Sequence, residues 1–303
     1  MPPVPEDGLL REGSKFHALS SFLKPDGEFR HRPVMNHHSS AENPALSAAN
    51  SYSSYRRIAA KLKGLPRRVA APSFVIPDTV GANCHFLEGL FPEVGLCLFE
   101  TDSCLAYGDQ DLPPDLPGLN LDYHVHLPLD LPWAQGAEAA AQATLDLVTK
   151  TAFLNPRFYV LHPPGTTGEL ERFCTLWHNA GLQNRDLLLE NIEGNDLDAL
   201  LGVSGDLGLS LCLDLGHMLS YEQQFLLRVA DWNRVRMLHV NAPGKSSRHE
   251  ALTSLGPEGK ILLQALLEHS RPETTVMLEI FGEQGLFDSA ALLAQWMEQW
   301  KLV

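Results

Sequence analysis

Four short apolar runs in the second half of the chain each end in a residue that can bind a metal ion. They are Asp186–Glu190, Leu209–Asp214, Val235–His239 and Thr275–Glu279. Three carboxylates and one imidazole make a hard, mostly oxygen ligand set, which suits manganese, zinc, magnesium or cobalt better than sulfur-loving metals. A single histidine after a strand is often structural, but four ligand residues at equivalent positions predict a metal centre.

Further histidines follow the same pattern. The runs Leu121–His126 and Phe158–His162 also end in histidine, and the Pro-Pro-Gly after His162 predicts a turn there. Two residues separate His124 from His126, so on a strand they share one face and either could be a ligand. The additional candidate ligands are His124, His126, His162, His217 and His249.

These candidates require a scaffold that brings the ends of successive strands together. Eight strand-like runs alternate with helix-like stretches, which predicts a (β/α)₈ TIM barrel, an α/β fold whose functional residues gather at the carboxyl ends of the strands. The predicted strands are Ser73–Pro77, Val94–Phe99, Leu121–Leu127, Phe158–His162, Asp186–Asn191, Leu209–Asp214, Val235–Val240 and Thr275–Phe281. Predicted helices are Ala134–Phe153, Glu169–Ala180, Glu222–Val229, Ile261–His269 and Leu286–Trp300.

The chain divides into two regions by composition. Its 303 residues, 44% of them hydrophobic, suit one barrel of about 250 residues plus an extension. Residues 71–303 are assigned to the barrel. Residues 1–70 are rich in Ser, Pro, Asn, His and Arg, so we expect a largely irregular, mostly disordered extension with one short helix near Tyr52–Leu65.

Charge and cysteine content narrow the function. Residues 1–70 hold 11 Lys/Arg and 6 Asp/Glu, whereas the rest holds 12 and 31. A domain this acidic repels polyanions, so nucleic acid is not an expected partner. Five cysteines without a CxxC pair, no secretory signal at the start and no long apolar run predict a protein of the reducing cytoplasm that does not span a membrane.

The ordered segments HVHLP, LHPPG, LLLEN, DLGH, LHVNAPGKSSRHE and LEI resemble the xylose-isomerase-like barrel superfamily, and within it the endonuclease-IV-type AP endonucleases. The resemblance implies two or three divalent ions, zinc, manganese or cobalt. The first would be held by His126 (or His124), His162 and Glu190, and Glu190 would bridge to a second held by Asp214, His239 and Glu279. His217 and His249 would face a third. Ser247 stands where the nucleases have an aspartate ligand, which would weaken that third site.

A narrower resemblance is to the cobamide-remodelling phosphodiesterases, carried by APSFVIPDTVGANCHFL, VGLCLFE, YHVHLPLDLPW, VLHPPG and LLLENI. It implies a small-molecule corrinoid substrate, whose nucleotide-loop phosphoester would be hydrolysed to adenosylcobinamide phosphate and the lower-ligand nucleoside. Glu190 would bridge the two ions and a bridging hydroxide would be the attacker. Glu279 would orient that hydroxide or ligate beside it, and His217 would assist at the phosphate. The residues expected to contact substrate are Glu100, Asn241, Lys245 and Arg248; Asn241 could instead orient its neighbours.

There are three alternatives to this function. A sugar isomerase or epimerase would need only the quartet Glu190, Asp214, His239 and Glu279 with a single metal. An AP endonuclease would use all three predicted metal sites, but the negative net charge of the barrel would oppose the binding of DNA. A non-catalytic corrinoid-binding module is disfavoured by the intact quartet.

Overall fold

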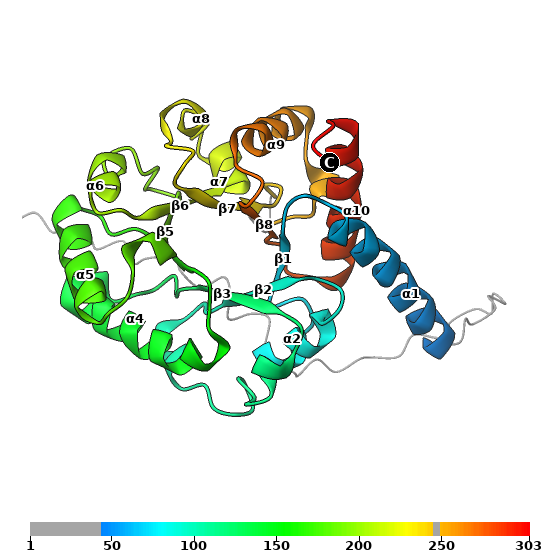
Figure 1. Cartoon of the computed structure of the whole chain (residues 1–303), viewed down its shortest axis with the longest axis horizontal. Helices are drawn as coiled ribbons and strands as arrows, with labels where there is room; N and C mark the ends of the chain where they lie inside the picture. Colours follow the sequence, from blue (N-terminus) through cyan, green and yellow to red (C-terminus); the bar gives the residue numbers. More distant parts are fainter. Residues whose placement is uncertain (1–43, 245–248) are drawn as a thin grey trace, which may run out of the picture. The chain divides into compact units, whose positions relative to one another are not determined.

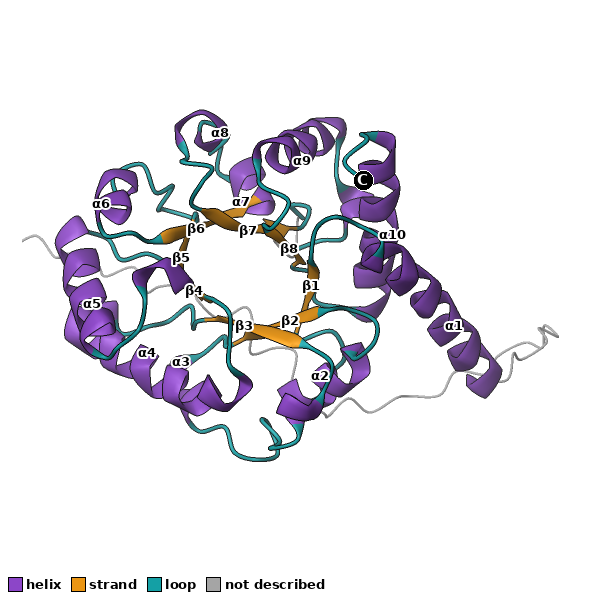
Figure 2. Cartoon of the chain, viewed as in Figure 1, coloured by secondary structure: helices purple, strands orange, loops and turns teal. Residues whose placement is uncertain are grey.

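The computed structural model describes residues 44–244 and 249–303, and within them it forms a closed barrel (Figure 1). Eight parallel strands pair in sequence order, and β1 pairs with β8 to close the ring. This confirms the predicted fold. Figure 2 shows the strands enclosed by helices. The strands are β1 Val69–Pro72, β2 Glu93–Cys97, β3 Asp122–His126, β4 Tyr159–Leu161, β5 Leu187–Glu190, β6 Ser210–Asp214, β7 Val235–Val240 and β8 Thr275–Leu278.

Helices follow the strands and cover the outside of the barrel. α4 shows why they do so: its apolar residues recur at helical spacing and are buried, while Glu138 and Lys150 mark its two ends. The helices are α1 Pro44–Lys63, α2 Val80–Leu87, α3 Thr101–Leu105, α4 Ala137–Thr151, α5 Thr167–Asn179, α6 Leu201–Asp206, α7 Leu215–Ser220, α8 Leu226–Val229, α9 Pro257–His269 and α10 Glu283–Gln299. None of these described helices combines the length and apolar character needed to cross a membrane.

The first strand was predicted in the wrong place. It is Val69–Pro72, and the apolar run Ser73–Pro77 is the loop that follows it. The buried side chain of Asn83 holds this loop, because its Oδ1 accepts from the backbone N–H groups of Val75 and Ile76 at 2.6 and 2.9 Å. The other seven predicted strands overlap the observed ones.

The short helix expected near Tyr52–Leu65 is part of α1, which lies beside α10 (Figure 1). The ring of Tyr55 stacks on Phe287 of α10, with centroids 3.7 Å apart and planes 9° from parallel. The boundary between extension and barrel that we expected after residue 70 falls within β1. Residues 1–43, on which most of the predicted disorder falls, lie outside the described residues, so the division into extension and barrel stays a prediction.

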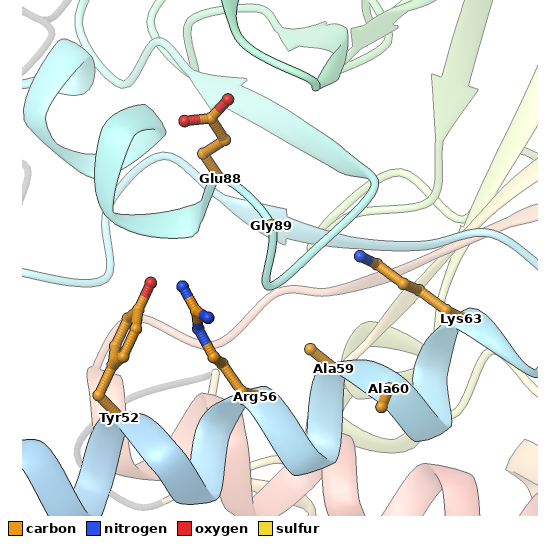
Figure 3. Close-up of a pocket in the computed structure, with 7 residues that line it drawn as sticks. All are labelled: Tyr52, Arg56, Ala59, Ala60, Lys63, Glu88 and Gly89. Atoms are coloured by element: carbon orange, nitrogen blue, oxygen red, sulfur yellow. The ribbon is translucent and has the colours of Figure 1, made fainter.

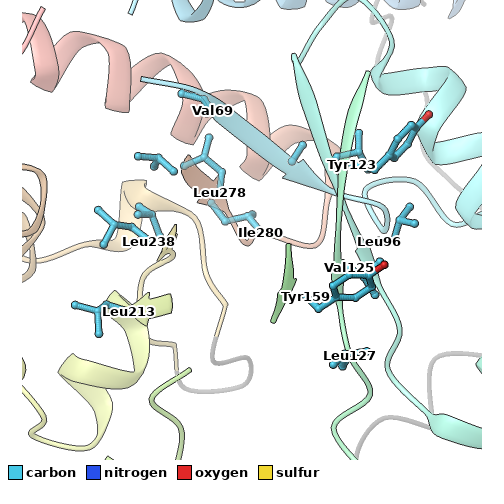
Figure 4. Packing of buried hydrophobic residues seen from close by; sticks show 14 of the residues in the cluster. Val69, Leu96, Tyr123, Val125, Leu127, Tyr159, Leu213, Leu238, Leu278 and Ile280 are labelled. Atoms are coloured by element: carbon cyan, nitrogen blue, oxygen red, sulfur yellow. The ribbon is translucent and has the colours of Figure 1, made fainter. Parts of the chain in front are cut away.

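Two layers of buried side chains hold the barrel. The larger layer lies between strands and helices and includes Val69, Leu96, Tyr123, Leu213 and Leu278 (Figure 4). A smaller apolar cluster comes from the opposite faces of the strands. Side chains alternate along a strand, so a residue two positions before a strand-end ligand lies one layer below it. The smaller cluster consists of Ala70, Cys97, Val160, Leu188, Cys212, Met237 and Met277, the last five of which precede candidate ligands by two residues.

Candidate metal centre

Six predicted ligands, from six consecutive strands, converge at the carboxyl end of the barrel. They form three overlapping groups, within each of which the ligand atoms lie within 4.8 Å of one another; one is His126, His239 and Glu279, and the other two share Glu190. Of these two, one is His126, His162 and Glu190. The other is Glu190, Asp214, His239 and Glu279.

Glu190 belongs to both of these last two groups, and its two oxygens face different partners. Oε2 lies 3.1 Å from Nε2 of His126 and 3.3 Å from Nε2 of His162. Oε1 lies 2.9 Å from Nδ1 of His239, which is also 3.2 Å from Oε2 of Glu279. Ligand atoms bound about 2.0–2.2 Å from one ion stand roughly 3 Å apart. The spacing therefore suits a carboxylate that bridges two ions.

Burial makes this cluster electrostatically demanding. The side chains of Glu190, Asp214 and Glu279 are almost inaccessible to solvent. Burial alone would raise the pKa of Glu190 and of Glu279, but His239 and the other histidines in contact hold both pKa values well below the usual range. Asp214 has a raised pKa, because burial and the two glutamates outweigh His217.

His126, His239 and His249 show the complementary pattern, whereas burial lowers the pKa of His162. Burial would lower the pKa of His239, but Cys212, Glu279 and Glu190 raise it well above its ordinary value. Likewise Glu279 and Asp214 outweigh burial and raise the pKa of His249 to about 9. Buried carboxylates need positive charge close by, and the histidines with raised pKa values are the groups in this cluster that can supply it. A divalent cation would meet the same need, so the donor set fits a metal ion.

Hydrogen bonds with three residues hold Asp214 in place. Its Oδ1 accepts from the backbone N–H of His217 at 2.5 Å, and its Oδ2 accepts from Nδ2 of Asn241 at 2.9 Å. Gly216 makes room for Asn241, since a Cβ at residue 216 would lie 1.8 Å from Oδ1 of Asn241. Asn191 bonds to the backbone of Asp214. Such bonds fix the orientation of a ligand.

Backbone carbonyls orient two of the histidines. Nδ1 of His126 lies 2.9 Å from the carbonyl of Leu127, and Nδ1 of His217 lies 2.8 Å from the carbonyl of Asn191. A carbonyl only accepts, so each Nδ1 carries the proton. Nε2 is then the nitrogen through which each ring would bind a metal or a substrate.

The structure separates His124 from His126. His124 is one layer lower and fully buried, with Nδ1 2.7 Å from Oε1 of Glu93 and Nε2 3.1 Å from the sulfur of Met277. The other oxygen of Glu93 accepts from Arg157 at 2.8 Å and lies 3.5 Å from Arg68. His126 therefore joins the ligand cluster, whereas His124 belongs to a buried ion-pair network toward the amino end of the barrel.

The predicted third site is only partly assembled. Nε2 of His249 lies 3.2 Å from Oε2 of Glu279, and the rings of His249 and His217 are 6.0 Å apart. Among the residues that the structure describes, no group of three close ligands includes either histidine. Ser247, Lys245 and Arg248 lie outside the described residues.

Two predicted substrate contacts can be placed. Glu100 is exposed just after β2, where its Oε2 accepts from the hydroxyl of Ser103 at 3.0 Å. Asn241 is fully buried against Asp214. That position favours the orienting role for Asn241, and its contact with substrate stays a prediction.

Sequence reasoning missed two residues at the site. Gln223 is buried in the segment after β6, accepts from Nδ2 of Asn191 at 2.8 Å and donates to the carbonyl of Ile192 at 2.8 Å. Cys212 lies below the quartet, with Sγ within 4.8 Å of ligand atoms of Glu190 and His239. Burial raises the pKa of this thiol to about 12. The alternation along β6 could have indicated Cys212, two residues before Asp214, but no local pattern marks Gln223.

A cavity of about 360 Å³ lies elsewhere, beside α1 and the turn before β2 (Figure 3). It is lined by Tyr52, Arg56, Ala59, Ala60, Lys63, Glu88 and Gly89. These residues precede β1 or β2, at the amino end of the barrel. Active sites of this fold lie at the opposite end, so the cavity is separate from the candidate metal centre.

Comparisons with known proteins support the architecture. No protein-family model matches the chain, and no curated protein does either. Solved structures do match. A D-tagatose 3-epimerase-like protein is 15% identical, with a TM-score of 0.54 over 77% of this chain and 98% of that one. The IOLI protein with a bound zinc atom is 11% identical, with a TM-score of 0.51 over 78% and 96%.

A third match is a xylose isomerase-like TIM barrel protein from Mycobacterium smegmatis in complex with magnesium, 12% identical, with a TM-score of 0.50 over 77% and 97%. Two of the three matched structures thus hold zinc or magnesium. None of the three is described as a cobamide phosphodiesterase, so that narrower resemblance stays a prediction. The likenesses show that this chain shares the barrel fold of the xylose isomerase-like proteins.

Proposed function

We propose that this protein is a metal-dependent enzyme that hydrolyses phosphoesters, with two ions joined by Glu190. The observation that carries the proposal is the orientation of Glu190, whose Oε2 faces His126 and His162 while Oε1 faces His239. An enzyme with a single metal at the quartet would not need the group formed by His126, His162 and Glu190. Paired ions suit phosphoester hydrolysis because they can hold both the nucleophile and the phosphate.

In this mechanism the ions would supply a hydroxide at neutral pH and positive charge for the phosphate oxygens. His126, His162 and Glu190 would hold one ion, and Glu190, Asp214, His239 and Glu279 the other. Glu279, whose Oε2 lies 3.2 Å from both His239 and His249, would orient the attacking oxygen. His217, fixed by its bond to Asn191, would offer Nε2 to the phosphate.

The proposed substrate is a small molecule, in line with the net charge of −14, which opposes polyanion binding. The sequence resemblance favours the nucleotide-loop phosphoester of an adenosylated cobamide. Cleavage there would yield cobinamide phosphate and the lower-ligand nucleoside.

The second candidate is a sugar epimerase with one metal at the quartet. The match to a D-tagatose 3-epimerase-like protein favours this candidate. The pair Glu190 and Glu279 also favours it, because two carboxylates could move a proton on a bound sugar. Under this alternative, His126 and His162 would bind no metal.

Metal content and products separate the two candidates. Purified protein would be analysed by inductively coupled plasma mass spectrometry, then incubated with adenosylcobalamin, with bis(p-nitrophenyl) phosphate and with D-tagatose. Two ions per chain and hydrolysis of a phosphodiester are expected. One ion per chain with epimerised sugar and intact phosphodiesters would refute the proposal in favour of the epimerase.

A further inference from the structure

Three phenylalanines lie in contact at the carboxyl end of the barrel. Phe74 follows β1, Phe99 follows β2 and Phe281 follows β8. The ring centroids of Phe74 and Phe99 are 5.3 Å apart at 90°, and those of Phe99 and Phe281 are 5.4 Å apart at 74°. Edge-to-face contacts of this kind are favourable aromatic arrangements.

This aromatic row leads into the metal centre. The ring of Phe281 lies 5.2 Å from that of His249, and Nε2 of His249 lies 3.2 Å from Oε2 of Glu279. The row therefore runs from the quartet, through His249, to Phe74 at the surface.

Phe74 is the exposed end of the row. Its side chain is 46% exposed and lies on the loop that follows β1. A single exposed apolar residue needs no explanation by itself. Here, however, two further rings continue the same apolar surface toward the ligands.

The loop that carries Phe74 is fixed in place. Asn83 is fully buried and accepts from the N–H groups of Val75 and Ile76, while its Nδ2 lies within 3.2 Å of the carbonyls of Ile76, Asp78 and Thr79. An apolar group held rigidly in the binding conformation loses little entropy when a ligand arrives.

We propose that Phe74, Phe99 and Phe281 form a substrate-binding wall that receives a planar aromatic ring carried beside the phosphoester. The inference rests on the proposed function for the position of the phosphate. An aromatic wall bordering a charged cluster matches a substrate with one flat apolar part and one anionic part. The wall thereby selects among phosphoesters by the ring they carry.

Binding measurements test the aromatic wall independently of catalysis. Calorimetry on metal-loaded protein would compare phenyl phosphate with methyl phosphate. Wild type should bind the phenyl ester roughly fivefold more tightly, the scale of one aromatic contact. Phe74→Ala should remove this preference, and Phe74→Tyr should keep it.

Phe153 provides the matched control. It is 42% exposed but precedes β4, at the opposite end of the barrel, so Phe153→Ala should retain the phenyl preference. The inference is overturned if wild type shows no preference, if Phe74→Ala keeps it, or if both alanine variants lose it equally.

A hydrolysis assay provides a second test of the aromatic wall. p-Nitrophenyl phenyl phosphate and p-nitrophenyl methyl phosphate share a leaving group, so the ratio of their kcat/KM values reports on the other substituent. Phe74→Ala should lower that ratio and Phe153→Ala should not. If wild type hydrolyses neither diester but its preference for phenyl phosphate still depends on Phe74, the wall stands and the proposed hydrolysis fails.

Discussion

The side chain of Asn191 pairs with the backbone of Asp214 as a neighbouring strand would. Its Oδ1 accepts from the N–H of Asp214 at 2.8 Å, and its Nδ2 lies 3.2 Å from the carbonyl of Asp214. The register between β5 and β6 ends at Glu190 and Cys212. Asn191 therefore extends the pairing by one residue and fixes Asp214 relative to Glu190.

Gln223 should support the metal centre through Asn191. Gln223→Ala would leave Nδ2 of Asn191 and the carbonyl of Ile192 without this buried partner, and we expect metal affinity to fall roughly tenfold, the lower end for partners of ligand residues. Competition with a chromophoric chelator would measure it. The neighbouring Gln224 is exposed, so Gln224→Ala is the control. Equal affinities in the two variants would contradict the role of Gln223.

Glu190→Gln should affect both ligand groups at once. An amide cannot bridge two ions as a carboxylate does, so metal content should drop and turnover should fall by about two orders of magnitude or more. Elemental analysis and a phosphodiester assay would show this, with the exposed Glu171→Gln as control. Turnover within a factor of two of wild type would rule out the bridge.

Gly216→Ala should disturb the site through packing. The new Cβ would meet Oδ1 of the buried Asn241 at 1.8 Å and push it from Asp214. We expect a loss of about 1–3 kcal/mol in the free energy of unfolding, typical of overpacking, with weaker metal binding. Gly202 in α6 has open space, so Gly202→Ala should be neutral or stabilising. Urea denaturation of both variants would decide.

The network around Glu93 should make stability depend on pH. Burial raises the pKa of Glu93, but its bond to His124 and the charges of Arg157 and Arg68 outweigh burial and lower it. A carboxylate with a lowered folded-state pKa stabilises the fold above its unfolded value, near 4.5, and this contribution is lost as pH falls through the folded value. Glu93→Gln should therefore cost roughly 3 kcal/mol at pH 7.

The difference between wild type and Glu93→Gln should shrink as pH falls below 4.5, because the unfolded chain then takes up a proton at Glu93 that the folded protein, with its lowered pKa, does not. Urea unfolding of both proteins at pH 7 and pH 4 would measure it. A difference that is constant with pH would show that the ion pairs of Glu93 add nothing beyond packing.

Tyr55 should join α1 to the barrel. Tyr55→Ala would remove the stacking on Phe287 and leave a cavity, at a cost of roughly 3 kcal/mol in unfolding free energy. Tyr52 lies on the same helix and is 40% exposed, so Tyr52→Ala should cost far less. Thermal unfolding of the two variants would test this, and similar melting temperatures would mean that α1 contributes little.

The convergence of the candidate ligands could be predicted because each of them ends a buried apolar run, and parallel strands bring their carboxyl ends together. The choice between His124 and His126 could not, because both face the interior and only the depth of each layer separates them. Gln223 was invisible for another reason: its partners, Asn191 and Ile192, are about thirty residues away in sequence. The prediction of a strand at Ser73–Pro77 was wrong because an apolar loop can have the same composition as a short strand.

The shared position of Glu190 also has a thermodynamic consequence. In the proposed two-ion site, an ion held by His126, His162 and Glu190 would fix the rotamer of Glu190 and withdraw electron density from its other oxygen, so it would change the affinity for the second ion. Linkage requires the second ion to change the affinity of the first by the same factor. The affinities of the two proposed sites should therefore be coupled, and a titration of metal into the protein should not fit two independent isotherms.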